Sequence, residues 1–372
     1  MTHSPSGGCP GYIGWVTAIA LGIPRVGAAG APVQPDLTGR GESPYLIDRH
    51  GRRARDLRVS LTDRCNLRCT YCMPAEGLDW QPADELLSDD ELVRIITVAV
   101  HRLGIQEIRF TGGEPLLRKG LPGIIARVAA LRPRPELSLT TNGIGFARRA
   151  GEFVDAGLDR INISLDSLDE DTFERITRRR RLPDVLAALD AAAAAGLTPV
   201  KINAVLLRGV NDHEAADLLG FALDHGYQLR FIEQMPLDAG HVWSRDRMVT
   251  ADEIQQRLAA RFELTPDPGA RLGAPAELFR VDGGPATVGI IASVTRPFCG
   301  DCDRTRLTAD GQIRTCLFAR AETDLRALLR GDGTDEQIAQ LWRGITWGKL
   351  PGHGIDDPSF LQPDRPMSAI GG

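Results

Sequence analysis

Six of the seven cysteines in this chain stand in two groups of three, more than two hundred residues apart. The first group has the spacing Cys-x3-Cys-x2-Cys and the second Cys-x2-Cys-x13-Cys. Three thiolates are one ligand short of the four that a cubane iron–sulfur cluster or a tetrahedral zinc site takes. We therefore predict two metal centres that can each bind a further ligand. The expected ligands are Cys65, Cys69 and Cys72 in the first trio and Cys299, Cys302 and Cys316 in the second trio.

The composition of the chain limits the classes of protein to which it can belong. The chain has 372 residues, 42% of them hydrophobic and 25% charged, which is typical of a globular protein of one large or two ordinary domains. A net charge of −5 gives no reason to expect nucleic acid or an anionic membrane as a partner, and no long apolar run predicts a membrane span. Clustered cysteines in odd number do not indicate a disulfide framework. Thiolate ligands for soft metals favour a reducing compartment, so we expect the cytoplasm.

The first 43 residues carry few structure signals and are rich in Gly, Pro and Ala. They include Cys9, the cysteine outside both trios. The moderately apolar stretch 12–23 has no basic region ahead of it, and Pro24 and Arg25 interrupt its end. We interpret residues 1–43 as a disordered extension, which we favour over an export signal.

Regular elements that could position the first trio begin at residue 57. Apolar runs predict strands, and amphipathic helical windows lie between them, one of which opens with a capping box at Ser88 and Glu91. Six strand–helix units predict an α/β fold, a partial (β/α)6 barrel of the TIM type over residues 44–265, since a full barrel takes eight units. Ligands in such folds bind at the carboxyl ends of the strands, where the first trio would lie. The predicted strands are 57–61, 107–111, 136–141, 160–165, 200–206 and 228–233.

The pattern changes after the Pro/Gly-rich stretch 266–275. Short strands are predicted at 278–281 and 287–291, and helices at 324–330 and 335–343, so residues 266–345 are expected to form a smaller α+β module that carries the second trio. From 346 onward the chain is expected to form an extended tail that ends in two glycines.

The first trio, with Tyr71 before its last cysteine, resembles the signature of the radical S-adenosylmethionine (SAM) enzymes. In that family the thiolates hold a [4Fe–4S] cluster, SAM chelates its open iron, and reduction releases a 5′-deoxyadenosyl radical. The Gly112-Gly113-Glu114 sequence after the second strand resembles the family's element for the amino group of SAM. A zinc site is the alternative, although the spacing is unlike the paired Cys-x2-Cys halves of zinc ribbons. The resemblance implies SAM contacts at Tyr71, Gly113, Ser164 and Met235.

The second trio and its surroundings, 298–311, resemble the carboxyl-terminal module of the GTP 3′,8-cyclases, the first enzymes of molybdenum cofactor biosynthesis. The resemblance extends over residues 46–372 and includes the closing Met-Ser-Ala-Ile-Gly-Gly. It implies a second [4Fe–4S] cluster whose open iron takes the guanine of GTP. The implied reaction removes hydrogen from C3′ of the ribose and joins that carbon to C8, which gives (8S)-3′,8-cyclo-7,8-dihydroguanosine 5′-triphosphate.

The resemblance also implies residue roles. Arg304 and Arg306 would contact the nucleotide beside the second cluster, and the closing Gly371 and Gly372 would enter the active site and support catalysis. A triphosphate carries about four negative charges, which guanidinium groups meet two oxygens at a time. The run 178–181, by contrast, is interpreted as a solvated face. The further implied GTP contacts are Arg58, Arg109, Thr140, Lys201 and Arg230.

Further partners follow from the same resemblance. The product would pass to cyclic pyranopterin monophosphate synthase, an electron donor such as flavodoxin or ferredoxin would supply the reducing electron, and a homodimer is possible. Two other classes stay open at this point. One is a radical peptide- or protein-modifying maturase, which can carry a second cluster in a similar module, and the other is a non-catalytic adaptor with two zinc ions.

Overall fold

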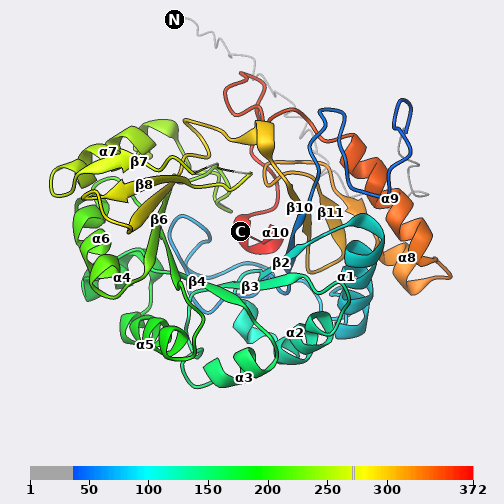
Figure 1. The fold of residues 1–372 in the computed structure, drawn as a ribbon, viewed down its shortest axis with the longest axis horizontal. Helices are drawn as coiled ribbons and strands as arrows, with labels where there is room; N and C mark the ends of the chain where they lie inside the picture. Colours follow the sequence, from blue (N-terminus) through cyan, green and yellow to red (C-terminus); the bar gives the residue numbers. More distant parts are fainter. Residues whose placement is uncertain (1–36, 270, 272, 372) are drawn as a thin grey trace, which may run out of the picture. The chain divides into compact units, whose positions relative to one another are not determined.

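The computed structural model describes residues 37–269, 271 and 273–371, and its centre is a row of six parallel strands (Figure 1). Each strand pairs with the next one along the chain, as in the predicted partial barrel, and the row does not close into a ring. The fold class is therefore confirmed. The strands are β1 (Asp56–Ser60), β2 (Glu107–Thr111), β3 (Glu136–Thr141), β4 (Arg160–Ser164), β5 (Lys201–Val205) and β6 (Gln228–Ile232).

Helices cover the convex outer face of this sheet (Figure 1). The predicted capping box is present: the side chain of Ser88 accepts from the backbone N–H of Glu91, and the Glu91 carboxylate accepts from the backbone of Ser88. Gly104 ends that helix in the left-handed conformation at φ 75°. The helices are α1 (Asp89–Leu103), α2 (Leu121–Ala129), α3 (Ala150–Asp155), α4 (Glu170–Thr177), α5 (Leu182–Ala194), α6 (Ala215–Asp224) and α7 (Ala251–Ala259).

The strands of the carboxyl-terminal part extend the same sheet at both edges. β10 (Arg304–Leu307) pairs parallel with β1, and β9 (Thr287–Ile291) pairs parallel with β6, so one sheet of twelve strands results. On its outer side, β10 pairs antiparallel with β11, and β9 pairs antiparallel with β8. The remaining elements are β7 (Leu264–Pro266), β8 (Glu277–Val281), β11 (Gln312–Arg314), β12 (Thr323–Asp324), α8 (Arg326–Arg330) and α9 (Asp335–Trp347).

Strand alternation decides which side chains face the interior of the open barrel. In β1, Leu57 and Val59 are fully buried in the core between sheet and helices, so Arg58 points to the inner face. In β2, Ile108 and Phe110 occupy the core in the same way, and Arg109 faces inward. Because the apolar side chains must be buried against the helices, the arginines that alternate with them along each strand must face the interior of the barrel.

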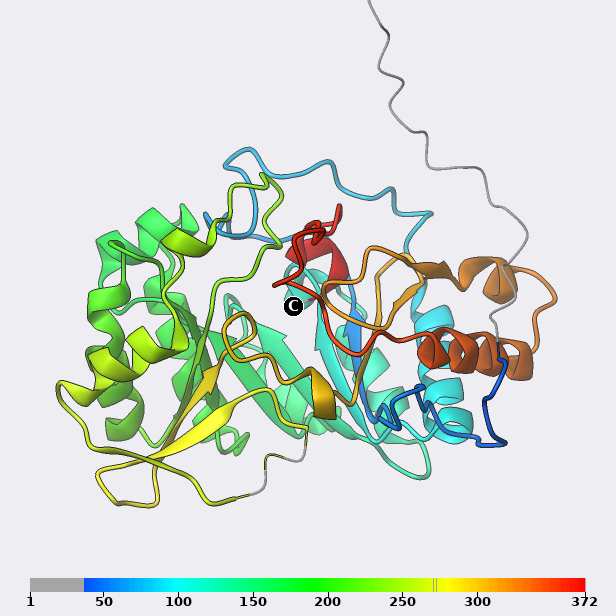
Figure 2. The same ribbon diagram turned by 90° about the horizontal axis from the view of Figure 1, so that it is seen from above.

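The predicted extended tail contains one short helix, α10 (Met367–Ile370). Ile370 is 1% exposed and packs in an apolar group with Leu237 and Val294, and this burial explains why the segment is not extended. Both ribbon views place α10 inside the curve of the sheet (Figures 1 and 2).

At the other end of the chain, most of the expected extension, residues 1–36 with Cys9, lies outside the described residues. Residues 38–39 form a turn, and the indole N–H of Trp347 donates to the carbonyl of Thr38 at 3.2 Å. Within the described ranges, no helix has both the length and the apolar character needed to cross a bilayer.

Candidate active site

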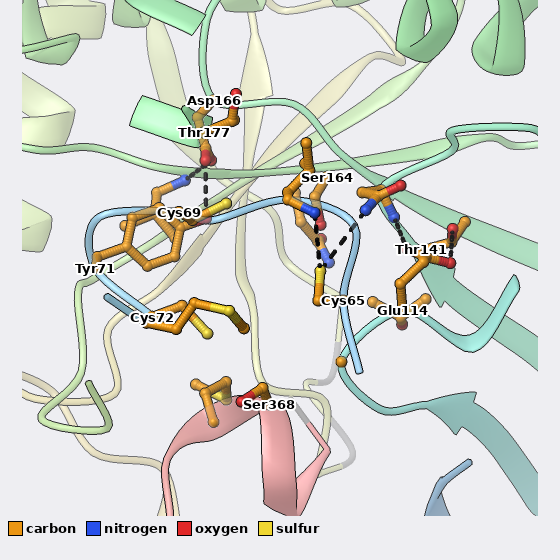
Figure 3. Close-up of a pocket in the computed structure, with 18 of the residues that line it drawn as sticks. Cys65, Cys69, Tyr71, Cys72, Glu114, Thr141, Ser164, Asp166, Thr177 and Ser368 are labelled. Atoms are coloured by element: carbon orange, nitrogen blue, oxygen red, sulfur yellow. Dashed lines mark hydrogen bonds between the residues drawn. The ribbon is translucent and has the colours of Figure 1, made fainter. Parts of the chain in front are cut away.

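The first trio lies in the loop after β1, at the carboxyl ends of the strands as predicted. Cys65, Cys69 and Cys72 are all free thiols and line a cavity of about 220 Å³ (Figure 3). The loop is held from outside by Arg178, whose guanidinium donates to the carbonyls of Arg68 at 2.9 Å and of Met73 at 3.0 Å. The interpretation of residues 178–181 as a solvated face is therefore wrong for Arg178.

The donor set of this loop fits an iron–sulfur cluster. Burial raises the pKa of Cys65 to about 11 and that of Cys72 to about 12, so the thiolates need a compensating cation. Among the described residues, no three His, Cys, Asp or Glu side chains close around a point where a single metal ion would sit. The three soft thiolates beside the cavity are one ligand short of the four that a [4Fe–4S] cluster takes, so one iron would stay open to a further ligand.

All four residues expected to contact SAM line the same cavity as the first trio: Tyr71, Gly113, Ser164 and Met235. The hydroxyl of Tyr71 donates to the carboxylate of Asp166 at 2.8 Å, which also accepts from the backbone N–H of Val205 at 2.8 Å. At Gly113 a Cβ atom would lie 2.4 Å from the carbonyl oxygen of Arg64, so only glycine fits this backbone.

Two carboxylates of this cavity were not among the residues expected to contact SAM, although Glu114 closes the Gly112-Gly113-Glu114 sequence noted above. Glu114 is 1% exposed, and burial raises its pKa to about 7, although it accepts hydrogen bonds from the Thr141 hydroxyl at 2.7 Å and from the Asn142 backbone at 2.8 Å. Asp166 is 5% exposed, and burial raises its pKa to about 6. The available signal was their place directly after strands β2 and β4, where polar side chains meet ligands.

The second trio is assembled from two turns. Cys299 and Cys302 lie at the two ends of the short 3₁₀ turn η4 (Cys299–Asp301), and Cys316 follows β11. The three thiols line a cavity of about 80 Å³ together with Arg304, Arg306 and Met235. Because Met235 lines both cavities, they share a wall. Burial opposes ionisation of Cys302, but Arg304 and Lys349 outweigh it and lower the pKa of this thiol to about 7.

A row of inward cations connects the edge of the second cavity with the barrel. Arg306, Arg58 and Arg109 occupy paired register positions on the adjacent strands β10, β1 and β2. Burial and the neighbouring Arg109 lower the pKa of Arg58 to about 10, and burial and Arg58 lower that of Arg306 to about 9. Nε of Arg58, Nε of Arg109 and Nη2 of Arg304 are buried without a hydrogen-bond partner among the described residues. Arg58 and Arg304 also lie near carboxylates, at 3.7 Å from Asp56 and 3.6 Å from Asp303. Mutually repelling donors that make no hydrogen bond are nevertheless suited to an anion.

The other expected nucleotide contacts lie farther along the sheet. Lys201 on β5 is 8% exposed, and burial, followed by Arg230 on β6, lowers its pKa to about 7. Burial also lowers the pKa of Arg230. Thr140 on β3 lines the cavity of the first trio and accepts from Asn162 at 3.3 Å, so it lies on the SAM side of the site.

The tail reaches this row of cations. Arg306 donates to the carbonyl of Gly371 at 2.7 Å, and Gly371 has φ 77°. A Cβ there would lie 2.9 Å from Cγ2 of Thr111 and 3.0 Å from Cβ of Ser60. Gly372 lies outside the described residues.

Comparison with known proteins agrees with this geometry. Residues 59–222 match the Radical SAM superfamily, and residues 227–355 match Molybdenum Cofactor Synthesis C. GTP 3′,8-cyclase of Streptomyces coelicolor is 66% identical over 328 residues, which are 88% of this chain and 96% of that protein. GTP 3′,8-cyclase of Mycolicibacterium smegmatis is 60% identical over 369 residues, which cover 96% of this chain and 100% of that protein.

A solved structure agrees at the level of the fold. The crystal structure of Streptococcus suis SuiB bound to S-adenosylmethionine aligns with a TM-score of 0.56 at 13% sequence identity, over 82% of this chain and 68% of that chain. At this identity the likeness concerns the fold alone. Identity above 60% across nearly the whole Streptomyces protein is decisive for the family. The chain therefore belongs to the GTP 3′,8-cyclase family of the radical SAM superfamily.

Proposed function

We propose that the residues of the two cavities carry out the cyclisation of GTP, the first step of molybdenum cofactor biosynthesis. As a family member the enzyme uses SAM and two [4Fe–4S] clusters. The observation that carries the residue roles is the row of buried arginines on adjacent strands, three of which have guanidinium donors without a hydrogen-bond partner among the described residues. A triphosphate is the kind of anion that such a row would bind.

The first trio would hold the cluster that binds SAM, with Tyr71, Gly113, Ser164 and Met235 around the cofactor. When bound, cluster and SAM supply a 5′-deoxyadenosyl radical, which abstracts hydrogen. The role of the protein would be to hold the loop of the first trio in place and to exclude water. Arg178 fixes the loop through two carbonyls, and Asp166 orients Tyr71 through its hydroxyl.

The second trio would hold the cluster that takes the guanine of GTP, and the cations would hold the rest of the nucleotide. Arg304 and Arg306 would contact it beside this cluster. Positioning of C3′ toward the SAM side would make the hydrogen abstraction effectively unimolecular, and holding C8 within reach of C3′ would fix the conformation from which the ring closes. The supporting observation is that the two cavities share the wall formed by Met235. The further proposed contacts are Arg58, Arg109, Thr140, Lys201 and Arg230.

Several partners remain proposals. An electron donor such as flavodoxin or ferredoxin would reduce the first cluster, and the product would pass to cyclic pyranopterin monophosphate synthase. The chemistry of thiolate-bound iron favours the cytoplasm. We also propose a homodimer as the assembly to test.

One experiment tests the proposed function. The clusters are reconstituted anaerobically, and the enzyme is given GTP, SAM and a strong reductant. We expect 5′-deoxyadenosine to form in step with a 3′,8-cyclised guanosine triphosphate. SAM cleavage that neither depends on GTP nor yields a cyclised nucleotide would contradict the proposal and favour a peptide-modifying enzyme. Zinc without sulfide in the purified protein would favour the adaptor.

A further inference from the structure

Lys349 lies directly behind the second trio, on a segment that the residue roles above do not use. It follows the end of α9, and it is 6% exposed. Its ammonium nitrogen lies 3.3 Å from Sγ of Cys302, 3.2 Å from the carbonyl oxygen of Cys302 and 3.0 Å from that of Arg304. These three contacts use all three N–H donors of the ammonium group.

The charge of Lys349 has no carboxylate partner among its described contacts, which are two carbonyls and one sulfur. A buried cation is costly unless an anion compensates it. The sulfur of Cys302 is the one group in contact that can become an anion. The positive charge of Lys349 would therefore be compensated by the Cys302 thiolate and by the negatively charged cluster that this thiolate would hold.

The choice of lysine also stands out in this sequence. The chain has 44 basic residues, of which three are lysines: Lys119, Lys201 and Lys349. Lys119 is exposed, whereas Lys201 and Lys349 are buried. The three donors of a compact ammonium are not confined to one plane, whereas the five donors of a guanidinium group are. The ammonium of Lys349 contacts three acceptors, two carbonyl oxygens and one sulfur.

A second cation, Arg52, holds this segment against the second trio. Arg52 forms a buried ion pair with Asp48 at 2.5 Å. The same guanidinium donates to the carbonyls of Cys299 at 2.7 Å, of Leu350 at 2.6 Å and of Pro351 at 2.8 Å. It therefore joins the turn of the second trio to the residues that follow Lys349. At the other end of the segment, the indole of buried Trp342 donates to the hydroxyl of Thr305 on β10 at 3.0 Å.

We propose that Lys349 is a positioning residue of the second cluster: it donates a hydrogen bond to the Cys302 thiolate and compensates the negative charge of the cluster, which raises the cluster's reduction potential. Net charge and hydrogen bonds to sulfur are two of the factors that set such potentials. The inference rests on the proposed role of the second trio as cluster ligands. It requires neither GTP nor SAM, so its test is separate from that of the cyclisation.

The test compares Lys349→Met, Lys349→Arg and the matched control Lys119→Met, which removes the same charge at an exposed site. Each full-length chain is reconstituted with both clusters. It is also prepared with Cys65, Cys69 and Cys72 replaced by Ser, so that only the signal of the second cluster remains. Iron content is measured first, and the reduction potential is then measured by EPR-monitored titration.

We expect Lys349→Met to shift the second cluster to a lower potential, Lys349→Arg to keep most of the wild-type value, and Lys119→Met to keep all of it. Loss of the second cluster's iron in the Met variant but not in the Arg variant would also support a need for the charge. An unchanged potential in Lys349→Met would overturn the proposal. Equal loss of iron in the Met and Arg variants would also overturn it, because the lysine would then act only through its shape.

Discussion

At the scale of single residues, the neighbouring guanidinium groups of Arg58 and Arg306 repel each other in the absence of substrate. GTP would relieve this repulsion. We expect Arg304→Ala or Arg306→Ala to weaken GTP binding by about 1.5–3 kcal/mol, the usual contribution of a charge-assisted hydrogen bond. Replacement by Lys should restore the affinity only partly, because lysine keeps the positive charge but cannot donate two parallel hydrogen bonds to a phosphate as a guanidinium group does. Calorimetric titration with GTP measures the effect, and wild-type affinity in both Ala variants would remove this pair from the site.

The charge of Lys201 should make GTP binding depend on pH. Burial lowers its pKa to about 7 in the free protein, so the side chain is cationic below that pH and neutral above it. A bound triphosphate favours the cation, and binding above pH 7 must then take up a proton. We expect the affinity for GTP to fall between about pH 7 and about pH 9 in the wild type.

Lys201→Met is the control for this pH dependence. We expect weaker binding in that variant, with a flatter profile over the same range. Calorimetric titration with GTP in buffers of different ionisation enthalpy measures the number of protons that the complex takes up on binding. A parallel fall of affinity in wild type and variant would assign the dependence to another group.

Site residues that belong to a short sequence motif could be identified from the sequence, and site residues that stand outside any motif could not. The cysteines, Gly113 and the Arg304/Arg306 pair stand in short patterns. Asp166 and Lys349 are single charged residues whose role depends on burial. Lys349 contacts Cys302 from 47 positions away in the chain, which no local pattern shows.

At the scale of elements, the tail helix α10 shows the same contrast between local and distant information. The sequence predicted that two terminal glycines enter the site, but it did not predict a helix before them. Met367 and Ile370 turn toward the apolar group around Leu237, which lies more than a hundred residues earlier. Arg365 holds the start of the segment through ion pairs of 2.9 Å each with Asp310 and Glu322.

The glycine at the end of this helix provides a test of the tail. Gly371→Ala would bring a Cβ to 2.9 Å from Thr111 and into a φ of 77°, which disfavours a side chain. We expect this variant, and deletion of residues 371–372, to keep both clusters and near-normal GTP affinity but to lose most cyclisation. An added peptide that copies residues 366–372 should restore part of the turnover of the deletion variant. Wild-type turnover in the deletion variant would show that the tail has no catalytic role.

At the scale of the whole molecule, strand boundaries were predictable but the order of strands at the sheet edges was not. The predicted strands 107–111 and 136–141 coincide with β2 and β3, since alternation of apolar residues is local. The pairing of Asp56 with Arg304 joins residues 248 positions apart, and this information is not in either segment alone. The boundaries 44–265 and 266–345 therefore remain predictions about parts of one continuous sheet.

This continuity predicts the behaviour of a barrel fragment. A chain cut after residue 265 loses β10 from the edge of β1 and β9 from the edge of β6, so both edges expose unpaired backbone groups next to apolar side chains such as Leu57 and Phe231. Exposed edges of this kind promote association. We expect residues 37–265 alone to aggregate and to retain little of the first cluster's iron, although they contain the whole first trio. Co-expression with residues 266–372 should restore soluble protein, because the missing strands can pair again. Gel filtration and iron analysis of both preparations decide the matter, and a monomeric fragment that carries its full cluster and cleaves SAM would show that the barrel is an independent domain.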